Sequence, residues 1–391
     1  MIKKRGNNSI KKILIPLFCI VIILILFEAS LRLFYPQLVF KHDIIESSTQ
    51  IFNESYYFPW ELKPLTKTQH ISVTDEFNVS ISTNSLGYRD YEFTIEKPGD
   101  IYRILMVGDS TTYGFGVEID ETYIKILEKY LNKGGNKRYS VINAGFKSGR
   151  SPDTEYLFIK NEGISLNPDM IMVGFFIGDD FNDYKRNIWE LDSEGDINRI
   201  ISKETYIDSK NRLRNIENGP ENGIKEKAYR INVFLSFHSH LYVLFKNTFR
   251  NILITLKNGK PEPGIYSLNY SERVERDIET TLDLLLKMKK IAYEHDIKFV
   301  ILIIPTKDQV YNYNIKDKNN DLLNWTRPNN ILTDFGERNN IEMIDILPYL
   351  REYVRYNKDM IYFKIDPHWN KNGNYVVGRS LYEEIKNKEI I

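Results

Sequence analysis

Four short polar segments, far apart along the chain, together contain the groups needed for acyl transfer through a covalent intermediate. They supply a serine hydroxyl, backbone N–H groups beside glycines, further polar side chains, and a carboxylate next to an imidazole. A serine hydroxyl attacks an ester only when a nearby base takes its proton, and an imidazole oriented by a carboxylate is such a base. The segments are Gly108-Asp109-Ser110-Thr111-Thr112, Asn143-Ala144-Gly145, Gly178-Asp179-Asp180 and Asp366-Pro367-His368-Trp369-Asn370.

The elements that must position these segments are short apolar strands that alternate with helices. The expected strands are 103–107, 139–142, 170–176, 298–304 and 341–344, and the expected helices are 120–131, 152–160, 271–295, 329–339 and 372–387. This alternation predicts an α/β fold, a three-layer α/β/α sandwich around a five-stranded parallel sheet, with the flavodoxin-like strand order 2-1-3-4-5. Ligands of such sheets bind beyond the carboxyl ends of the strands, where the four segments are expected to meet.

The expected catalytic residues are Ser110 as nucleophile, His368 as its base and Asp366 as the group that orients the imidazole. Two simpler interpretations stay open: Ser110 or a neighbouring threonine caps a helix, and Asp366 belongs to an ordinary Asp-Pro turn. Asp109 is expected to be structural and to bind backbone donors around the turn.

Of the six histidines, only His368 sits in an expected strand-end loop beside an acidic residue. His42, His70 and His295 are expected at the surface. The aromatic residues Tyr113, Phe115 and Trp369 are equally compatible with lining an acyl or sugar pocket and with core packing.

The motifs resemble those of the SGNH/GDSL hydrolases, over roughly residues 80–385 without the insertion described below. The segment from Gly108 to Val117 is similar to the family's first block, and Asn143-Ala144-Gly145 to its second. Gly178-Asp179-Asp180 takes the place of the third block and Asp366-Pro367-His368 that of the last, while residues 84–90 resemble a lead-in found in membrane-anchored members. The resemblance implies the flavodoxin-like SGNH fold and an oxyanion hole formed by the Ser110 and Gly145 N–H groups and the residue at position 179.

Two departures from the family pattern concern activity and substrate. Asp179 stands where the family usually has Asn, and a carboxylate repels an oxyanion to which an amide would donate. Three alternatives follow for the third oxyanion donor. Asp179 is protonated, or the Ser110 and Gly145 N–H groups form the oxyanion hole alone, or Asn182 donates in place of Asp179. In the last block, Asp and His are separated by one residue and followed by Trp. This form resembles branches that act on polysaccharide acyl groups.

The ends and linkers of the chain predict how it is organised. Residues 1–12 form a basic tail, and residues 13–35 form an apolar helix that can span a membrane with the N-terminus in the cytoplasm and the remainder outside. A cleaved signal peptide is the alternative. Residues 37–98 are expected to form a β-rich stalk or hairpin that packs on the main domain, with strands at 71–73 and 77–82. The hydrolase domain is expected at 99–391, with a partly helical cap or lid inserted at 185–270.

Composition limits the other function classes. Lys+Arg and Asp+Glu both number 53, so no net charge favours nucleic acid. The only cysteine, Cys19, lies in the apolar run, so neither a disulfide framework nor a cysteine metal site is possible. No phosphate-binding or dinucleotide motif is present, and no cofactor or metal is expected.

Two functions are compatible with the sequence. The first is an extracytoplasmic serine esterase or O-acyltransferase acting on O-acyl groups, acetyl among them, of cell-envelope glycans or lipids. The second, motivated by Asp179, is a non-catalytic membrane-anchored glycan-binding or assembly protein that retains the fold. The expected partners are an ester-bearing carbohydrate or lipid, and the membrane through residues 13–35.

Overall fold

The computed structural model divides into two compact units. The helical unit consists of Met1–Asp43 and Asn218–Glu262, and the main unit of Ile44–Glu217 and Pro263–Ile391. The structure describes residues 7–37, 39, 51–72, 74–134, 137–147, 149, 151–207, 213–215, 231–232, 234–258, 264–311 and 323–391.

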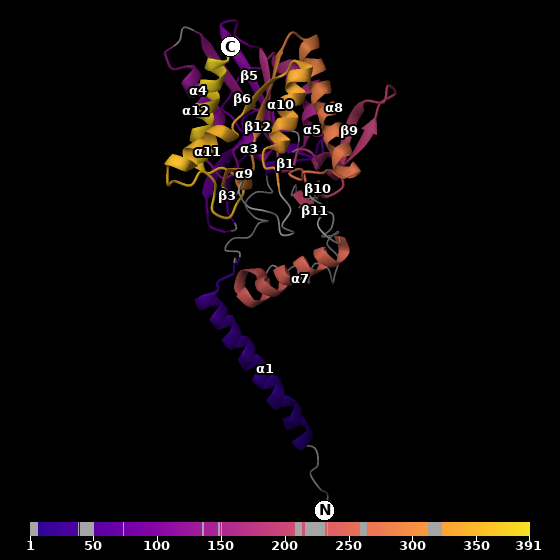
Figure 1. Ribbon diagram of the computed structural model, residues 1–391, viewed down its shortest axis with the longest axis vertical. Helices are drawn as coiled ribbons and strands as arrows, with labels where there is room; N and C mark the ends of the chain where they lie inside the picture. The colour runs from indigo at the N-terminus through magenta and orange to yellow at the C-terminus, as the bar shows by residue number, and fades with distance from the viewer. Residues whose placement is uncertain are drawn as a thin grey trace, which may run out of the picture. The chain divides into compact units, whose positions relative to one another are not determined.

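A five-stranded parallel sheet forms the centre of the main unit (Figure 1). Its strands are β5 (Ile101–Gly108), β6 (Arg138–Asn143), β7 (Met170–Phe176), β12 (Lys298–Ile304) and β13 (Glu342–Asp345). Their order across the sheet is β13-β12-β7-β5-β6, which confirms the predicted order 2-1-3-4-5. The interior strands β7 and β12 are almost wholly apolar because both of their faces are covered.

Helices cover both faces of the sheet and complete the predicted three-layer sandwich. Successive strand residues point to opposite faces, so Leu105 and Val107 pack in one core and Ile104 and Met106 in the other. The first core includes α5 (Pro152–Asn161), α8 (Glu272–Glu294) and α10 (Arg327–Asn339), and the second α4 (Tyr123–Leu131), α11 (Leu347–Tyr356) and α12 (Lys371–Asn387). The helix α11 has no counterpart among the helices expected from the sequence. Short helices are α3 (Ser110–Tyr113), η2 (Ile119–Glu121), η3 (Gly163–Leu166), η4 (Asp183–Arg186) and α9 (Lys307–Tyr311).

The segment before the sheet belongs to the main unit and forms two antiparallel pairs. They are β1 (Phe52–Asn53) with β2 (Glu61–Leu62), and β3 (Lys67–Ile71) with β4 (Asn78–Ser82). A small apolar core joins this segment to Tyr113 of α3. The strand β3 begins four residues before the predicted 71–73, because its polar first residues carry no apolar signal, and Val73 lies outside the described residues.

The insertion at 185–270 contributes to both units. In the main unit it forms β8 (Asn187–Leu191) paired with β9 (Ile197–Ser202), and β10 (Thr205–Ile207) paired with β11 (Leu213–Asn215). In the helical unit it forms α7 (His240–Asn258). Its expected role as a cap or lid stays a prediction.

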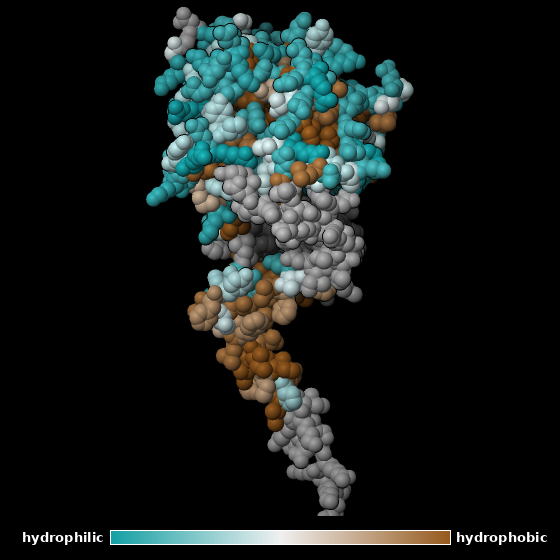
Figure 2. Space-filling model, viewed as in Figure 1, coloured by the Kyte–Doolittle hydropathy of each residue, from teal (hydrophilic) through white to brown (hydrophobic). Residues whose placement is uncertain are grey.

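The helical unit also contains α1 (Asn7–Phe34), in which the 21 residues Leu14–Phe34 are long and apolar enough to cross a membrane. Length and composition are the only grounds for this statement, so a retained anchor and a signal sequence both stay open. In Figure 2, hydrophobic residues gather on α1 and α7, whereas the visible face of the main unit is mostly hydrophilic.

Candidate active site

Ser110 is the first residue of α3, in a sharp turn at the carboxyl end of β5. Asp109 caps this short helix, since its Oδ1 accepts a hydrogen bond from the Thr111 N–H at 2.8 Å. Gly114 closes the helix in the left-handed conformation at φ 85°, where a side chain would be strained. The capping role that the sequence left open for Ser110 therefore belongs to Asp109, and the serine hydroxyl is available for other contacts.

The structure brings Ser110, His368 and Asp366 into one chain of hydrogen bonds. The Ser110 Oγ lies 2.7 Å from His368 Nε2, although the two residues are 258 positions apart in sequence. The Nδ1 of His368 lies 2.7 Å from Asp366 Oδ1. Burial acts to raise the pKa of Asp366, but its hydrogen bonds with His368 outweigh burial and hold that pKa below its usual value. A charged Asp366 orients the ring so that Nδ1 donates to the carboxylate and Nε2 accepts from the serine.

The loop that carries Asp366 is held by Glu76, from the turn between β3 and β4. Glu76 accepts hydrogen bonds from the Ile365 and Asp366 N–H groups, both at 2.8 Å. Lys307 donates to the carbonyls of Phe363 and Lys364 on the same loop. Glu76 was not among the residues expected at the site, because an acidic residue in a polar turn has no distinguishing sequence pattern.

An aromatic cluster supports the imidazole of His368. The Phe115 ring stacks on it with centroids 4.4 Å apart, and His70 and Phe77 pack edge-on against Phe115. The expectation that His70 lies at the surface is wrong, because the residue is only 9% exposed. Burial, and then the charge of Arg89, lower the pKa of His70 to about 4. His70 shares the buried face of β3–β4 with its partner Val79, a pattern that could have identified it.

The other two aromatic residues left open by the sequence belong to the core. Tyr113 and Trp369 are both almost completely buried. Tyr113 packs with the β1–β4 segment, and Trp369 packs in the sheet core against Tyr123. Of the three candidates, only Phe115 touches a predicted catalytic side chain.

Residues of the lead-in segment hold the nucleophile loop and the end of β6. The buried Arg89 donates hydrogen bonds to the backbone carbonyls of Tyr113, Gly114 and Val117, around the turn that carries Phe115. Its neighbour Asp90 accepts from the Asn143 N–H at 2.8 Å.

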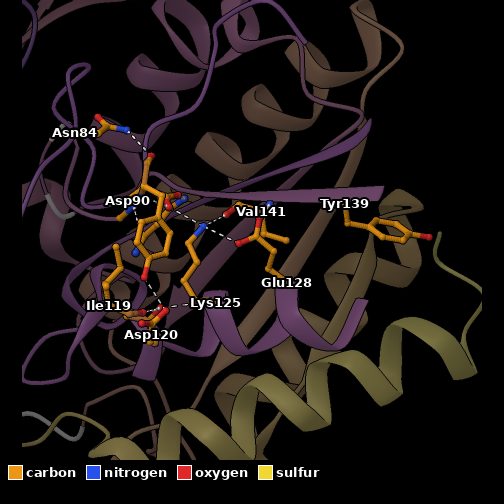
Figure 3. A network of polar contacts seen from close by, with 12 residues as sticks. Asn84, Asp90, Ile119, Asp120, Lys125, Glu128, Tyr139 and Val141 are labelled. Carbon is orange, nitrogen blue, oxygen red and sulfur yellow. Dashed lines mark hydrogen bonds and ion pairs between the residues drawn. The ribbon is translucent and has the colours of Figure 1, made fainter. Parts of the chain in front are cut away.

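Asp90 is fixed in turn by Lys125 of α4. Figure 3 shows the Lys125 ammonium between Asp90, at 2.6 Å, and Glu128, at 2.9 Å, where it also donates to the Val141 carbonyl. A buried cation with two carboxylates and a carbonyl has its hydrogen-bonding capacity satisfied. The network therefore fixes the strand that leads to the predicted oxyanion segment.

The predicted oxyanion donors differ in their present contacts. Gly145 packs so closely on α3 that a Cβ there would lie 2.2 Å from the Tyr113 backbone nitrogen. Its N–H already donates to the side-chain oxygen of Asn143 at 3.0 Å. Asp179 is exposed, and its charge is one cause of a raised pKa at Asp109, after burial. A carboxylate, and not an amide, thus stands near the nucleophile. Asn182, the alternative donor, is also exposed.

Three carboxyl groups are buried behind the nucleophile turn. Burial raises the pKa of Asp109, and it raises those of Glu155 and Asp180 well above their usual values, with mutual repulsion adding to the effect. Asp180 accepts a hydrogen bond from the Phe176 N–H at 2.7 Å. The sequence did not indicate that Glu155 is buried, because an acidic residue in the first turn of a helix such as α5 is usually solvated. Within the described ranges, no group of three or more His, Cys, Asp or Glu residues could hold a metal ion.

The sheet order and the meeting of Ser110 with an Asp-x-His segment at its carboxyl edge define an SGNH hydrolase-like domain. Residues 266–391 match a family model described as "SGNH hydrolase-like domain, acetyltransferase AlgX". This match places residues 266–391 in the SGNH hydrolase-like family. The matched residues include Asp366 and His368, whereas Ser110 lies outside them.

Solved structures of related fold are similar at low identity. The acetyl xylan esterase AlAXEase is 13% identical, covering 72% of this chain and 99% of its own, with a TM-score of 0.40. A G-D-S-L family lipolytic protein from Veillonella parvula is 14% identical, covering 72% and 97%, with a TM-score of 0.37. A two-domain esterase active on acetylated mannans is 11% identical, covering 73% and 50%, with a TM-score of 0.35. No curated protein sequence matches the chain.

Proposed function

We propose that the protein is an extracytoplasmic, membrane-anchored serine esterase or O-acyltransferase with Ser110, His368 and Asp366 as its catalytic residues. The observation that carries the proposal is the hydrogen-bonded chain from Ser110 Oγ through His368 to Asp366, with 2.7 Å at each step. These distances fall within the range for proton transfer between a nucleophile and its base.

The reaction follows from this geometry. Ser110 Oγ attacks the ester carbonyl while its proton passes to His368 Nε2, and the carbonyl becomes a tetrahedral oxyanion. The C–O bond to the leaving alcohol then breaks, and His368 returns the proton to that alcohol. Water or a sugar hydroxyl attacks the acyl-enzyme next and loses its proton to His368. The bond between the acyl carbon and Ser110 Oγ then breaks, and His368 gives the proton to that oxygen. Water gives hydrolysis, and a sugar hydroxyl gives acyl transfer.

The backbone N–H groups of Ser110 and Gly145 are the proposed oxyanion donors. The Gly145 N–H must exchange its Asn143 acceptor for the oxyanion, and Asp179 lacks the amide donor that an asparagine would supply. Loss of one oxyanion-hole donor costs about 10²–10³ in rate, so we expect slower turnover than in a site with all three donors.

The proposed substrates are O-acyl groups, acetyl among them, on cell-envelope glycans or lipids. The family model that matches is described for an acetyltransferase, which supports an acetyl group. The Asp-x-His-Trp spacing resembles that of polysaccharide-modifying branches, which supports a glycan. The basic tail before α1 supports a cytoplasmic N-terminus, with the main unit outside the membrane.

The test is hydrolysis of p-nitrophenyl acetate by the full-length protein in detergent. We expect Ser110→Ala and Asp366→Asn to lower kcat/KM by about 10³-fold or more, as triad substitutions do. The exposed Asp359→Asn provides the same chemical change outside the site and should leave the rate unchanged. Equal rates for wild type and Ser110→Ala would refute the proposal.

A second candidate function is a non-catalytic glycan-binding or assembly protein. It is favoured by the carboxylate of Asp179 near the nucleophile and by the engaged N–H of Gly145. A fluorophosphonate probe distinguishes the two, because it modifies only an activated serine. A covalent adduct on Ser110 excludes the non-catalytic alternative, whereas an unlabelled protein that still binds acetylated glycan supports it.

A further inference from the structure

The first turn of α7 is attached to α1 through one carboxylate. Glu28 Oε2 accepts hydrogen bonds from the Ser239 hydroxyl at 3.0 Å and the Leu241 N–H at 2.8 Å. Glu28 Oε1 accepts from the His240 N–H at 3.0 Å and from Arg32 Nε at 2.7 Å. Glu28 thus satisfies backbone donors that the start of a helix leaves free, and its charge complements the helix dipole.

Further contacts fix the same junction within the helical unit. Arg32 donates to the His238 carbonyl at 2.5 Å, and the Gln37 N–H donates to His240 Nδ1 at 2.8 Å. Leu31 on α1 and Val243 on α7 are both buried, although most other described side chains of these helices are not. The start of α7 is therefore docked on α1 and does not merely follow a linker.

The junction lies near the carboxyl end of the proposed membrane span. Glu28 precedes the last residue of α1, Phe34, by six positions, which is about 9 Å along a helix. The hydrocarbon core of a bilayer is about 30 Å thick, so α7 begins near its boundary and not near its centre. An ionised carboxylate at such a depth needs partners, and the α7 terminus provides them.

The described side chains around α7 include several exposed apolar residues. Phe245 and Phe249 lie four positions apart, on one side of the helix, and are 61% and 63% exposed. Ile231 and Phe234, in the preceding helical turn, are 59% and 60% exposed. The sequence of α7 contains three basic residues and no acidic one. Apolar residues along one side and basic residues elsewhere are typical of helices that lie at the surface of an anionic membrane.

We infer that α7 is an interfacial helix, whose Phe245 and Phe249 enter the boundary between lipid headgroups and acyl chains beside the end of α1. The inference rests on the proposed anchoring of α1, and it gives the helical part of the insertion a membrane-binding role. The continuity of α7 with the span, through Glu28, and its positive charge favour a lipid surface over a second copy of this chain.

The interfacial position of α7 can be tested by fluorescence quenching. The full-length protein is placed in vesicles of phosphatidylethanolamine and phosphatidylglycerol, with and without brominated lipids that quench fluorescence. An environment-sensitive fluorophore is attached to Phe245→Cys or Phe249→Cys in a Cys19→Ser background. Asn247→Cys is the matched control, because position 247 lies on the opposite side of the same helix. Cys19 of the otherwise unchanged protein reports on the span itself.

We expect brominated lipids to quench the labels at 245 and 249 at least about twofold more than the label at 247. Equal quenching at the three positions, with Cys19 strongly quenched, would overturn the interfacial helix while leaving the anchor intact. A label at 245 that is shielded by self-association and not by lipid would also overturn it. An unquenched Cys19 would overturn the anchor and this inference together. Circular dichroism and p-nitrophenyl acetate hydrolysis check that each variant is folded.

Discussion

The residues around His368 are held in different protonation states by their surroundings. Hydrogen bonds from His368 favour the charged form of Asp366, whereas burial favours the neutral form of His70. A neutral His70 does not compete with the His368 ring for the Asp366 carboxylate. It supports Phe115, which stacks on that ring. This arrangement requires that His70 stays unprotonated in the folded protein.

His70 makes the protein sensitive to acid. Its pKa is about 4 in the folded state, compared with 6.5 for an unperturbed histidine. As the pH falls from 6.5 to 4, the unfolded chain binds a proton that the folded protein does not, so folding stability is lost in this window. His70→Phe should reduce that loss by up to about 3 kcal/mol. Thermal unfolding at pH 6.5 and pH 4 measures the difference. The exposed His295→Phe is the control, and an identical loss in both variants would contradict the explanation.

At the scale of elements, the hairpin β3–β4 acts on the site from outside the sheet. Glu76 in its turn binds two backbone N–H groups of the loop that carries Asp366. Glu76 contacts no reacting atom, so its role is to position that loop.

Glu76→Ala should lower kcat by about 10–100-fold while changing KM little, because two charge-assisted hydrogen bonds are lost and the His368 ring moves. Glu76→Gln, which keeps one acceptor oxygen, should recover part of the rate. Lys67→Ala, an exposed change on the same hairpin, should have no effect. A fall in melting temperature with unchanged kcat would show a purely structural role.

The contact between the loop after β6 and α3 admits only glycine. A Cβ at Gly145 would meet the Tyr113 nitrogen at 2.2 Å and the Thr112 carbonyl carbon at 2.6 Å, and backbone atoms cannot move aside as a flexible side chain can. Gly145→Ala should therefore destabilise the protein by about 1–3 kcal/mol and reduce its activity. Gly99→Ala is the control, since nothing lies within 4 Å of its added Cβ. Chemical denaturation of both variants measures the effect, and equal stabilities would refute the close approach.

At the scale of the whole molecule, the chain builds its helical unit from two segments, one at its start and one from within the main unit. The proposed anchor requires that the first segment is retained after export. The protein isolated from membranes should then have the full mass of 46.2 kDa. Cleavage of a signal peptide would lower the mass by about 2–3 kDa, corresponding to the roughly 15–30 residues typical of such peptides. Intact-mass spectrometry distinguishes the two results.

The sequence by itself determined the sheet. The strands at 170–176 and 298–304 agree with β7 and β12 residue for residue, and the predicted strand order is the observed one. The reason is that a parallel strand buried on both faces needs apolar residues at consecutive positions, and such a run is visible in the sequence. The position of Ser110 directly after such a run followed from the same pattern, whereas Asp366-Pro367-His368 lies between α11 and α12 and not in the loop that directly follows β13.

Only the tertiary structure decided which polar groups meet. Loop conformation and packing between distant segments bring Ser110 within hydrogen-bonding distance of His368. They also place His70 against Phe115 and Glu76 against the loop of Asp366, and they give the Gly145 N–H its acceptor on Asn143. The same holds for Glu155, whose burial behind the nucleophile turn has no local signal. Local periodicity records which side of an element is buried, but not which element covers it.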